Sequence, residues 1–154
     1  MGTAQTKKDI LMFKHLIASA FALPLMTAPT LAEDLRLTLT LPEGDETRGS
    51  LLVGVFTSQE AFNDGEIAHG CIHPALPGDN QITLSDLPAG TYGISVFLDQ
   101  NDNGELDRNL LGIPSEPYGF TRNPTIRFSA PGFNRFSFDY DGQGGEFTIN
   151  LNGL

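Results

Sequence analysis

The strongest constraint on the fold of this chain is the alternation of apolar and polar residues in several short segments. Residues 35–41 carry a leucine at every second position, and residues 92–98 place Tyr, Ile, Val and Leu at every second position. Because successive side chains of a strand point to opposite faces, each segment predicts a β-strand with one apolar face. Residues that favour turns, namely Pro, Gly, Asn and Asp, separate these segments.

The alternating segments and the turn signals together predict about seven to eight short strands and no helix longer than a turn or two. An antiparallel β-sandwich is the expected architecture, and a barrel is the alternative. We expect one helical turn at residues 58–62, with Ser58 as its N-cap. The predicted strands are residues 35–41, 49–56, 67–72, 81–84, 87–99, 125–129, 135–140 and 145–151.

The N-terminal region has the pattern of a secretory signal peptide. A basic start precedes an apolar run at residues 16–26, and the small residues Thr30 and Ala32 occupy the −3 and −1 positions of a cleavage site. The run is too short to span a bilayer, and a membrane anchor or a buried helix is the alternative. We predict residues 1–32 as the signal peptide, residues 33–154 as one mature domain, and a periplasmic or secreted location.

The net charge of the mature chain limits the classes of partner that we expect it to bind. Of nine basic and nineteen acidic residues, cleavage would remove three lysines and Asp9, which leaves six arginines, eighteen acidic residues and a formal charge of −12. Such a surface repels phosphate backbones, which argues against nucleic-acid binding, and it suits divalent cations. No membrane span is expected in the mature chain. Cys71 is the single cysteine, so no intramolecular disulfide can form.

Residues 99–107 show the sharpest local pattern, because oxygen-bearing side chains recur there at alternate positions. Side chains at this spacing converge on one point, and Gly104 permits the sharp bend that a calcium loop needs. We predict a calcium site whose ligands are Asp99, Asn101, Asn103, the carbonyl group of Glu105, and Asp107.

This pattern departs from an EF-hand loop at its twelfth position. Leu110 stands where the EF-hand carries a bidentate glutamate, and a distant carboxylate such as Glu116 would have to substitute for it. The affinity is therefore expected to be weak, in the range of about 10⁻⁴ to 10⁻³ M. The alternative is that the Asp and Asn side chains only form turns at a hairpin tip.

A second candidate site is the run from His69 through Cys71 to His73, whose side chains would share one face of a strand. Imidazole and thiolate groups bind soft metals, so the run is a hypothetical copper or zinc site. The three residues span about 13 Å along an extended strand, which is too far for one ion without a bulge. A polar edge segment without a metal is the favoured interpretation.

Three blocks of the chain resemble a known family. They are residues 86–92 (DLPAGTY), the 99–107 loop, and residues 111–123 (LGIPSEPYGFTRN). Together they resemble the DUF2141 family of uncharacterised exported bacterial proteins, which implies export and a fold but no reaction. The family usually has Ser and Asn where this chain has Thr121 and Arg122. The strand at LPAGTY also resembles transthyretin-like domains and the Cna-B-like repeat sandwiches of bacterial surface proteins, in fold only.

Residues 111–123 form a long connection with several prolines, glycines and aromatic residues. Loops of this length in a compact domain are usually either functional or disordered. We predict a binding surface that includes Glu116, Tyr118 and Phe120, for an unknown protein or carbohydrate partner. The alternative is that the aromatic residues only plug the open end of the sandwich.

The sequence as a whole favours a non-enzymatic exported module in which the 99–107 loop binds calcium weakly and supports this surface. No nucleophile elbow, phosphate-binding loop or dinucleotide fingerprint is present. A soft-metal carrier is one alternative function. The other is a hydrolase or carbohydrate-active enzyme whose acid and base come from Asp99, Asp102, Asp107 and Glu116.

Overall fold

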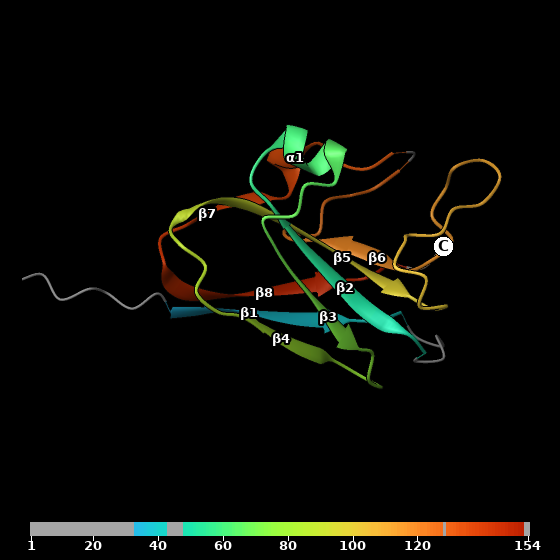
Figure 1. The fold of residues 1–154 in the computed structure, drawn as a ribbon, viewed down its shortest axis with the longest axis horizontal. Coiled ribbons are helices and arrows are strands. Elements are labelled where there is room, and N and C mark those ends of the chain that lie inside the picture. Colours follow the sequence, from blue (N-terminus) through green and yellow to red (C-terminus); the bar gives the residue numbers. More distant parts are fainter. Residues whose placement is uncertain (1–32, 43–47, 128, 153–154) are drawn as a thin grey trace, which may run out of the picture. The chain divides into compact units, whose positions relative to one another are not determined.

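The alternating segments fold as strands in two sheets (Figure 1). The computed structural model describes residues 33–42, 48–127 and 129–152, and this part of the chain contains eight strands and one short α-helix. The predicted signal peptide, residues 1–32, lies outside the described residues. The strands are β1 (Glu33–Thr40), β2 (Ser50–Phe56), β3 (His69–Pro74), β4 (Asn80–Leu84), β5 (Gly90–Asp99), β6 (Tyr118–Phe120), β7 (Ser137–Tyr140) and β8 (Gln143–Asn150).

The pairing of the strands confirms the sandwich prediction. One sheet has the order β4-β1-β8, and the other has the order β3-β2-β5-β6, with β7 also paired to β5. The pairs are antiparallel except β1–β8, which is parallel, with Leu37 opposite Phe147. The exception arises because the chain crosses between the sheets after β7, so that β8 enters beside the start of β1, with Gln143 opposite Glu33.

The apolar faces of the two sheets pack against each other as one core, which is what the alternating pattern predicted. Full burial of a Leu, Ile or Val side chain stabilises the fold by about 1.5–3 kcal/mol. The fully buried residues of this core include Leu35, Leu37, Leu39 and Ile149 from the three-stranded sheet and Leu51, Val55, Ile94 and Leu98 from the five-stranded sheet.

A cluster of aromatic rings covers the opposite face of the five-stranded sheet, under the helix α1 (Gln59–Asp64). The helix confirms the predicted turn: Ser58 Oγ accepts a hydrogen bond from the backbone N–H of Ala61 at 3.0 Å. Gly93 makes room for the rings, since a Cβ atom there would lie 2.5 Å from the ring of Phe136. The rings in contact are those of Phe56, Phe62, Phe120, Phe133 and Phe136.

The prediction of a strand at residues 125–129 is wrong, because none of its described residues lies in a strand. Instead β6, which the alternation did not predict, pairs with Ser95–Phe97 of β5. The rest of that edge of β5, Gly90–Gly93, pairs with β7. Because β6 and β7 already pair with this edge of β5, residues 125–129 cannot pair with it. The other predicted strands are present, with ends shifted by a few residues.

Thr121, the residue after β6, lies between β6 and β7 along this edge of β5. Its side chain is buried, and its Oγ1 atom accepts a hydrogen bond from the N–H of Ile94 at 3.2 Å and donates one to the carbonyl oxygen of Phe136 at 2.5 Å. The hydroxyl group thus supplies hydrogen-bond partners to the N–H group of Ile94 and the carbonyl group of Phe136, where the pairing of β5 changes from β6 to β7.

We expect the Thr121→Val variant to lower the free energy of unfolding by about 2 kcal/mol, because it leaves a buried N–H and a buried carbonyl unpaired at nearly constant volume. Thr121→Ser keeps the hydroxyl and removes one methyl group, so its loss should be at most about 1 kcal/mol. Urea unfolding followed by circular dichroism measures both values. Equal losses in the two variants would contradict this role of the hydroxyl.

β6 also contacts the end of the three-stranded sheet. Tyr118 and Asn152 exchange two backbone hydrogen bonds, at 3.3 and 2.9 Å, and the side chain of Asn123 accepts one from the N–H of Asn150 at 2.8 Å. Gly119 permits this approach, since a Cβ atom there would lie 2.7 Å from the Asn150 carbonyl oxygen. These hydrogen bonds join the two sheets close to the connection between β5 and β6. The candidate site lies on this connection.

None of the helices in the described residues is long and apolar enough to cross a membrane.

Candidate functional site

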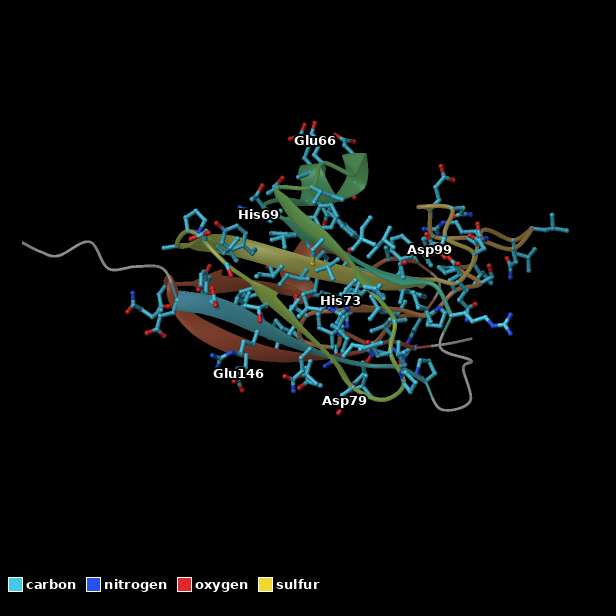
Figure 2. The ribbon with its side chains drawn as sticks, turned by 60° about the horizontal axis from the view of Figure 1, so that its bottom comes forward. Glu66, His69, His73, Asp79, Asp99 and Glu146 are labelled. Carbon is cyan, nitrogen blue, oxygen red and sulfur yellow. The ribbon has the colours of Figure 1, made fainter. Side chains whose placement is uncertain are left out.

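The predicted calcium loop begins at Asp99, the last residue of β5, which Figure 2 labels at the end of the sheet. Asp99 is only 1% exposed. Its two carboxylate oxygens accept hydrogen bonds from the backbone N–H groups of Asn103, at 3.1 Å, and Gly104, at 2.7 Å. The backbone of Asp99 lies close to Gly49, which has a φ of +92°. A Cβ atom on Gly49 would lie 1.8 Å from the Asp99 carbonyl oxygen, so only glycine fits at this position. The loop is therefore folded around a buried carboxylate.

Three of the predicted ligand side chains meet within the loop. The carboxamide nitrogens of Asn101 and Asn103 donate to the two carboxylate oxygens of Asp107, at 2.7 and 3.0 Å. Their carboxamide oxygens accept the backbone N–H groups of Asn103, at 3.1 Å, and Glu105, at 2.8 Å. Three of the predicted ligands thus meet through carboxamide nitrogens and a carboxylate, and a cation would require the two carboxamides to turn their oxygens toward Asp107.

Glu116, the substitute considered for the missing twelfth ligand, reaches both ends of the loop. Glu116 is 5% exposed, and its two carboxylate oxygens accept hydrogen bonds from the backbone N–H groups of Gln100, at 2.8 Å, and Asp107, at 2.9 Å. The sequence named Glu116 as one distant carboxylate, but only the fold shows that it lies against the loop. Two buried carboxylates, each holding two backbone N–H groups, therefore shape this loop.

The donor chemistry of the loop suits a hard cation. Its side chains present carboxylate and carboxamide oxygens, which calcium takes as six to eight ligands. Among the described residues, no three His, Cys, Asp or Glu side chains cluster closely enough to hold a metal ion by themselves. A cation in this loop would therefore depend on carboxamide and backbone oxygens as well as on carboxylates.

A short hairpin follows the loop and projects beyond the sheets in Figure 1. Arg108 and Pro114 form a backbone bridge at its base, and the Arg108 Nη1 atom donates a hydrogen bond to the carbonyl oxygen of Gly112 at 3.0 Å. Leu110 and Leu111 lie exposed at its tip. The backbone of the hairpin thus holds the guanidinium group of Arg108 in place.

Beside the hairpin, a groove with a volume of about 360 Å³ lies on the aromatic face of β5 and β6. Half-buried Phe97 and Tyr118 and buried Phe120 line it, together with residues of α1 and of the hairpin. Arg108 and Arg127 also line it, from two separate connections of the chain. We call this site the arginine groove.

The arginine groove contains two of the three residues of the predicted binding surface. Tyr118 and Phe120 line it and pack edge to face at a ring distance of 6.0 Å, whereas Glu116 lies under the loop. The sequence did not predict a role for Arg108 or Arg127. No local signal identifies them, because they belong to no common motif and only the fold brings them to one groove.

The side chains of His69, Cys71 and His73 share a face of the edge strand β3 but do not converge. Figure 2 shows the two histidines at separate points along β3. His73 Nδ1 forms a hydrogen bond with the carbonyl oxygen of Pro74 at 3.0 Å, and Cys71 packs against the core. Burial raises the pKa of the Cys71 thiol, which disfavours the thiolate that a soft metal needs. The geometry gives no support to the soft-metal alternative.

The geometry does not favour the hydrolase alternative either. An acid and base pair must face a bound substrate. Asp99 and Glu116 are buried and hold backbone N–H groups, and Asp102 accepts a hydrogen bond from the Ser50 hydroxyl group at 2.8 Å. None of these three carboxylates, nor Asp107, lines the arginine groove.

A protein-family model covers most of the chain. The model described as "Uncharacterized protein conserved in bacteria (DUF2141)" matches residues 40–148, a range that includes the loop, Glu116 and the arginine groove. No curated protein and no solved structure matches the chain.

Proposed function

The chain belongs to the DUF2141 family of uncharacterised bacterial proteins, and we propose that it is an exported, non-enzymatic binding module of the periplasm. The 99–107 loop binds one calcium ion weakly, through the ligands predicted from the sequence. The bound ion orders the connection between β5 and β6. The arginine groove is the surface that contacts the partner.

One observation carries this proposal: the Glu116 carboxylate connects the loop to the strand beside the groove. It accepts hydrogen bonds from Gln100 at the start of the loop and from Asp107 at its end. Tyr118, the first residue of β6, follows two residues later and lines the arginine groove. A cation that held the loop closed would therefore also hold the start of β6 in place.

The charges of the loop supply a reason for a cation. Asp99, Asp107 and Glu116 all belong to this loop or hold its backbone, although they do not cluster closely enough to form a metal site by themselves, and like charges in one region are unfavourable. Backbone N–H groups offset part of this repulsion. A divalent cation would offset more of it, in a domain whose net charge is already strongly negative.

We expect calcium at about 5 mM to raise the melting midpoint by about 5 °C, because a ligand at ten times its dissociation constant stabilises the folded state by about 1.4 kcal/mol. The measurement is thermal unfolding followed by circular dichroism, in calcium, in magnesium and in a chelator. Magnesium should shift the midpoint less, since it demands a near-ideal octahedral site.

Two variants make this test specific. Asp107→Asn should remove most of the calcium shift, because it takes a charged ligand from the site. Asp34→Asn changes an exposed residue of β1 and should retain the full shift. Identical midpoints in calcium and in chelator would remove the metal from the proposal.

A further inference from the structure

We infer that the arginine groove binds a small organic anion, in which a carboxylate group is attached to an aromatic or aliphatic body. This inference rests on the proposed function, because it names the class of ligand for the contact surface. It is carried by the size, the lining and the charge of the groove.

The size and the lining of the groove suit a small molecule. Its volume of about 360 Å³ falls within the range of small-molecule sites, about 300–1,000 Å³, which are lined mainly by apolar and aromatic side chains. Phe97 and Tyr118 contribute half-buried rings, and Ile113 and Pro114 of the hairpin add aliphatic surface. An apolar body of a ligand would displace water from these rings and side chains.

The charge of the groove is opposite to that of the domain. Acidic residues outnumber arginines by three to one after residue 32. Yet Arg108 and Arg127 line the groove, and Arg135 joins Arg127 in an adjoining cavity of about 550 Å³. Among the described residues that line these two cavities, none is an aspartate or a glutamate. The groove is therefore a cationic region on an anionic protein.

The guanidinium groups of Arg108 and Arg127 have more N–H donors than the hydrogen bonds they form in the described part of the chain. Arg108 uses one nitrogen to hold the Gly112 carbonyl oxygen, and the guanidinium group has five N–H donors in total. Within the described part of the chain, neither Arg108 nor Arg127 forms an ion pair. Guanidinium groups bind carboxylates through paired, charge-assisted hydrogen bonds. An anionic group of a ligand would supply the acceptors that these donors lack.

The probe is 4-phenylbutyrate, and its neutral amide, 4-phenylbutyramide, is the matched control. Titration of the purified protein, followed by ¹H–¹⁵N NMR in calcium, should give shifts at β5, β6 and the hairpin with a dissociation constant of about 1 mM. The amide should bind at least about tenfold more weakly, because a hydrogen bond to a charged group contributes about 1.5–3 kcal/mol.

Arginine variants locate the anion. Arg108→Gln and Arg127→Gln should each weaken binding of 4-phenylbutyrate by about tenfold. Arg36→Gln changes an exposed arginine of β1 that pairs with Glu146, and it should leave the affinity unchanged. The NMR spectra of the free variants also report whether each one is folded.

Three outcomes would overturn the inference: equal affinity for the acid and the amide, equal weakening by Arg36→Gln, or shifts that lie away from the groove. Repeating the titration in chelator separates it from the calcium proposal. Binding in both conditions supports the groove and contradicts only its dependence on calcium. A calcium shift of the melting midpoint without any binding of 4-phenylbutyrate would retain the metal and reject the anion.

Discussion

We expect the Asp99→Ala variant to lower the free energy of unfolding by about 4 kcal/mol, because it leaves two backbone N–H groups without their charged acceptor. The Asn103 and Gly104 N–H groups both bond to this one buried carboxylate, at 3.1 and 2.7 Å. Without it, the 99–107 loop loses the group around which it folds. Urea unfolding in the presence of a chelator measures this loss apart from any effect of calcium.

Asp102→Asn is the control for this prediction, because Asp102 has a φ of 56°, a left-handed conformation that Asn tolerates and Ala does not. Asp102 is exposed, and its carboxylate accepts one hydrogen bond, from the Ser50 hydroxyl group. Its loss should therefore be below about 1 kcal/mol. If the two variants were equally stable, Asp99 would be one more acidic residue of the loop and not its organising group.

The Phe136→Ala variant is expected to lower the free energy of unfolding by about 4 kcal/mol, within the range found for Phe-to-Ala changes in packed interiors. Phe136 is fully buried and contacts three other rings, those of Phe62, Phe120 and Phe133. Because Phe62 and Phe120 line the arginine groove, the same variant should also weaken binding of 4-phenylbutyrate.

Phe133→Ala provides the comparison, since Phe133 is half-buried at the margin of the same cluster. Its loss should be about 1–2 kcal/mol, as a smaller part of the ring leaves contact with other atoms. Denaturant unfolding and the NMR titration report stability and binding separately. A Phe136→Ala variant that is no less stable than Phe133→Ala would contradict the central place of Phe136 in the cluster.

The sandwich could be predicted from the sequence because its cause is local. In a strand the side-chain period is two, so the leucines of residues 35–41 must share one face wherever the strand pairs. The same holds for residues 92–98 of β5. The helical turn after Ser58 also depends on neighbours in the sequence, through its capping hydroxyl group.

The strands that were mistaken or missed depend on partners far away in the chain. The three residues of β6 have no distinctive pattern, and they form a strand because Ser95–Phe97 offers a free edge. Residues 125–129 have apolar and β-branched residues, but that edge is already paired. The parallel pairing of β1 with β8 likewise follows from where the chain crosses between sheets.

The candidate site divides in the same way. The alternating Asp and Asn side chains of the 99–107 loop are close in the sequence, so the sequence by itself indicated that Asn101, Asn103 and Asp107 lie together. The contact of Glu116 with both ends of that loop involves residues from separate segments, and so does the placement of Arg108 and Arg127 along one groove. Only the tertiary structure decided these, because the position of a distant side chain depends on how the sheets pair and pack, and residue spacing does not contain that information.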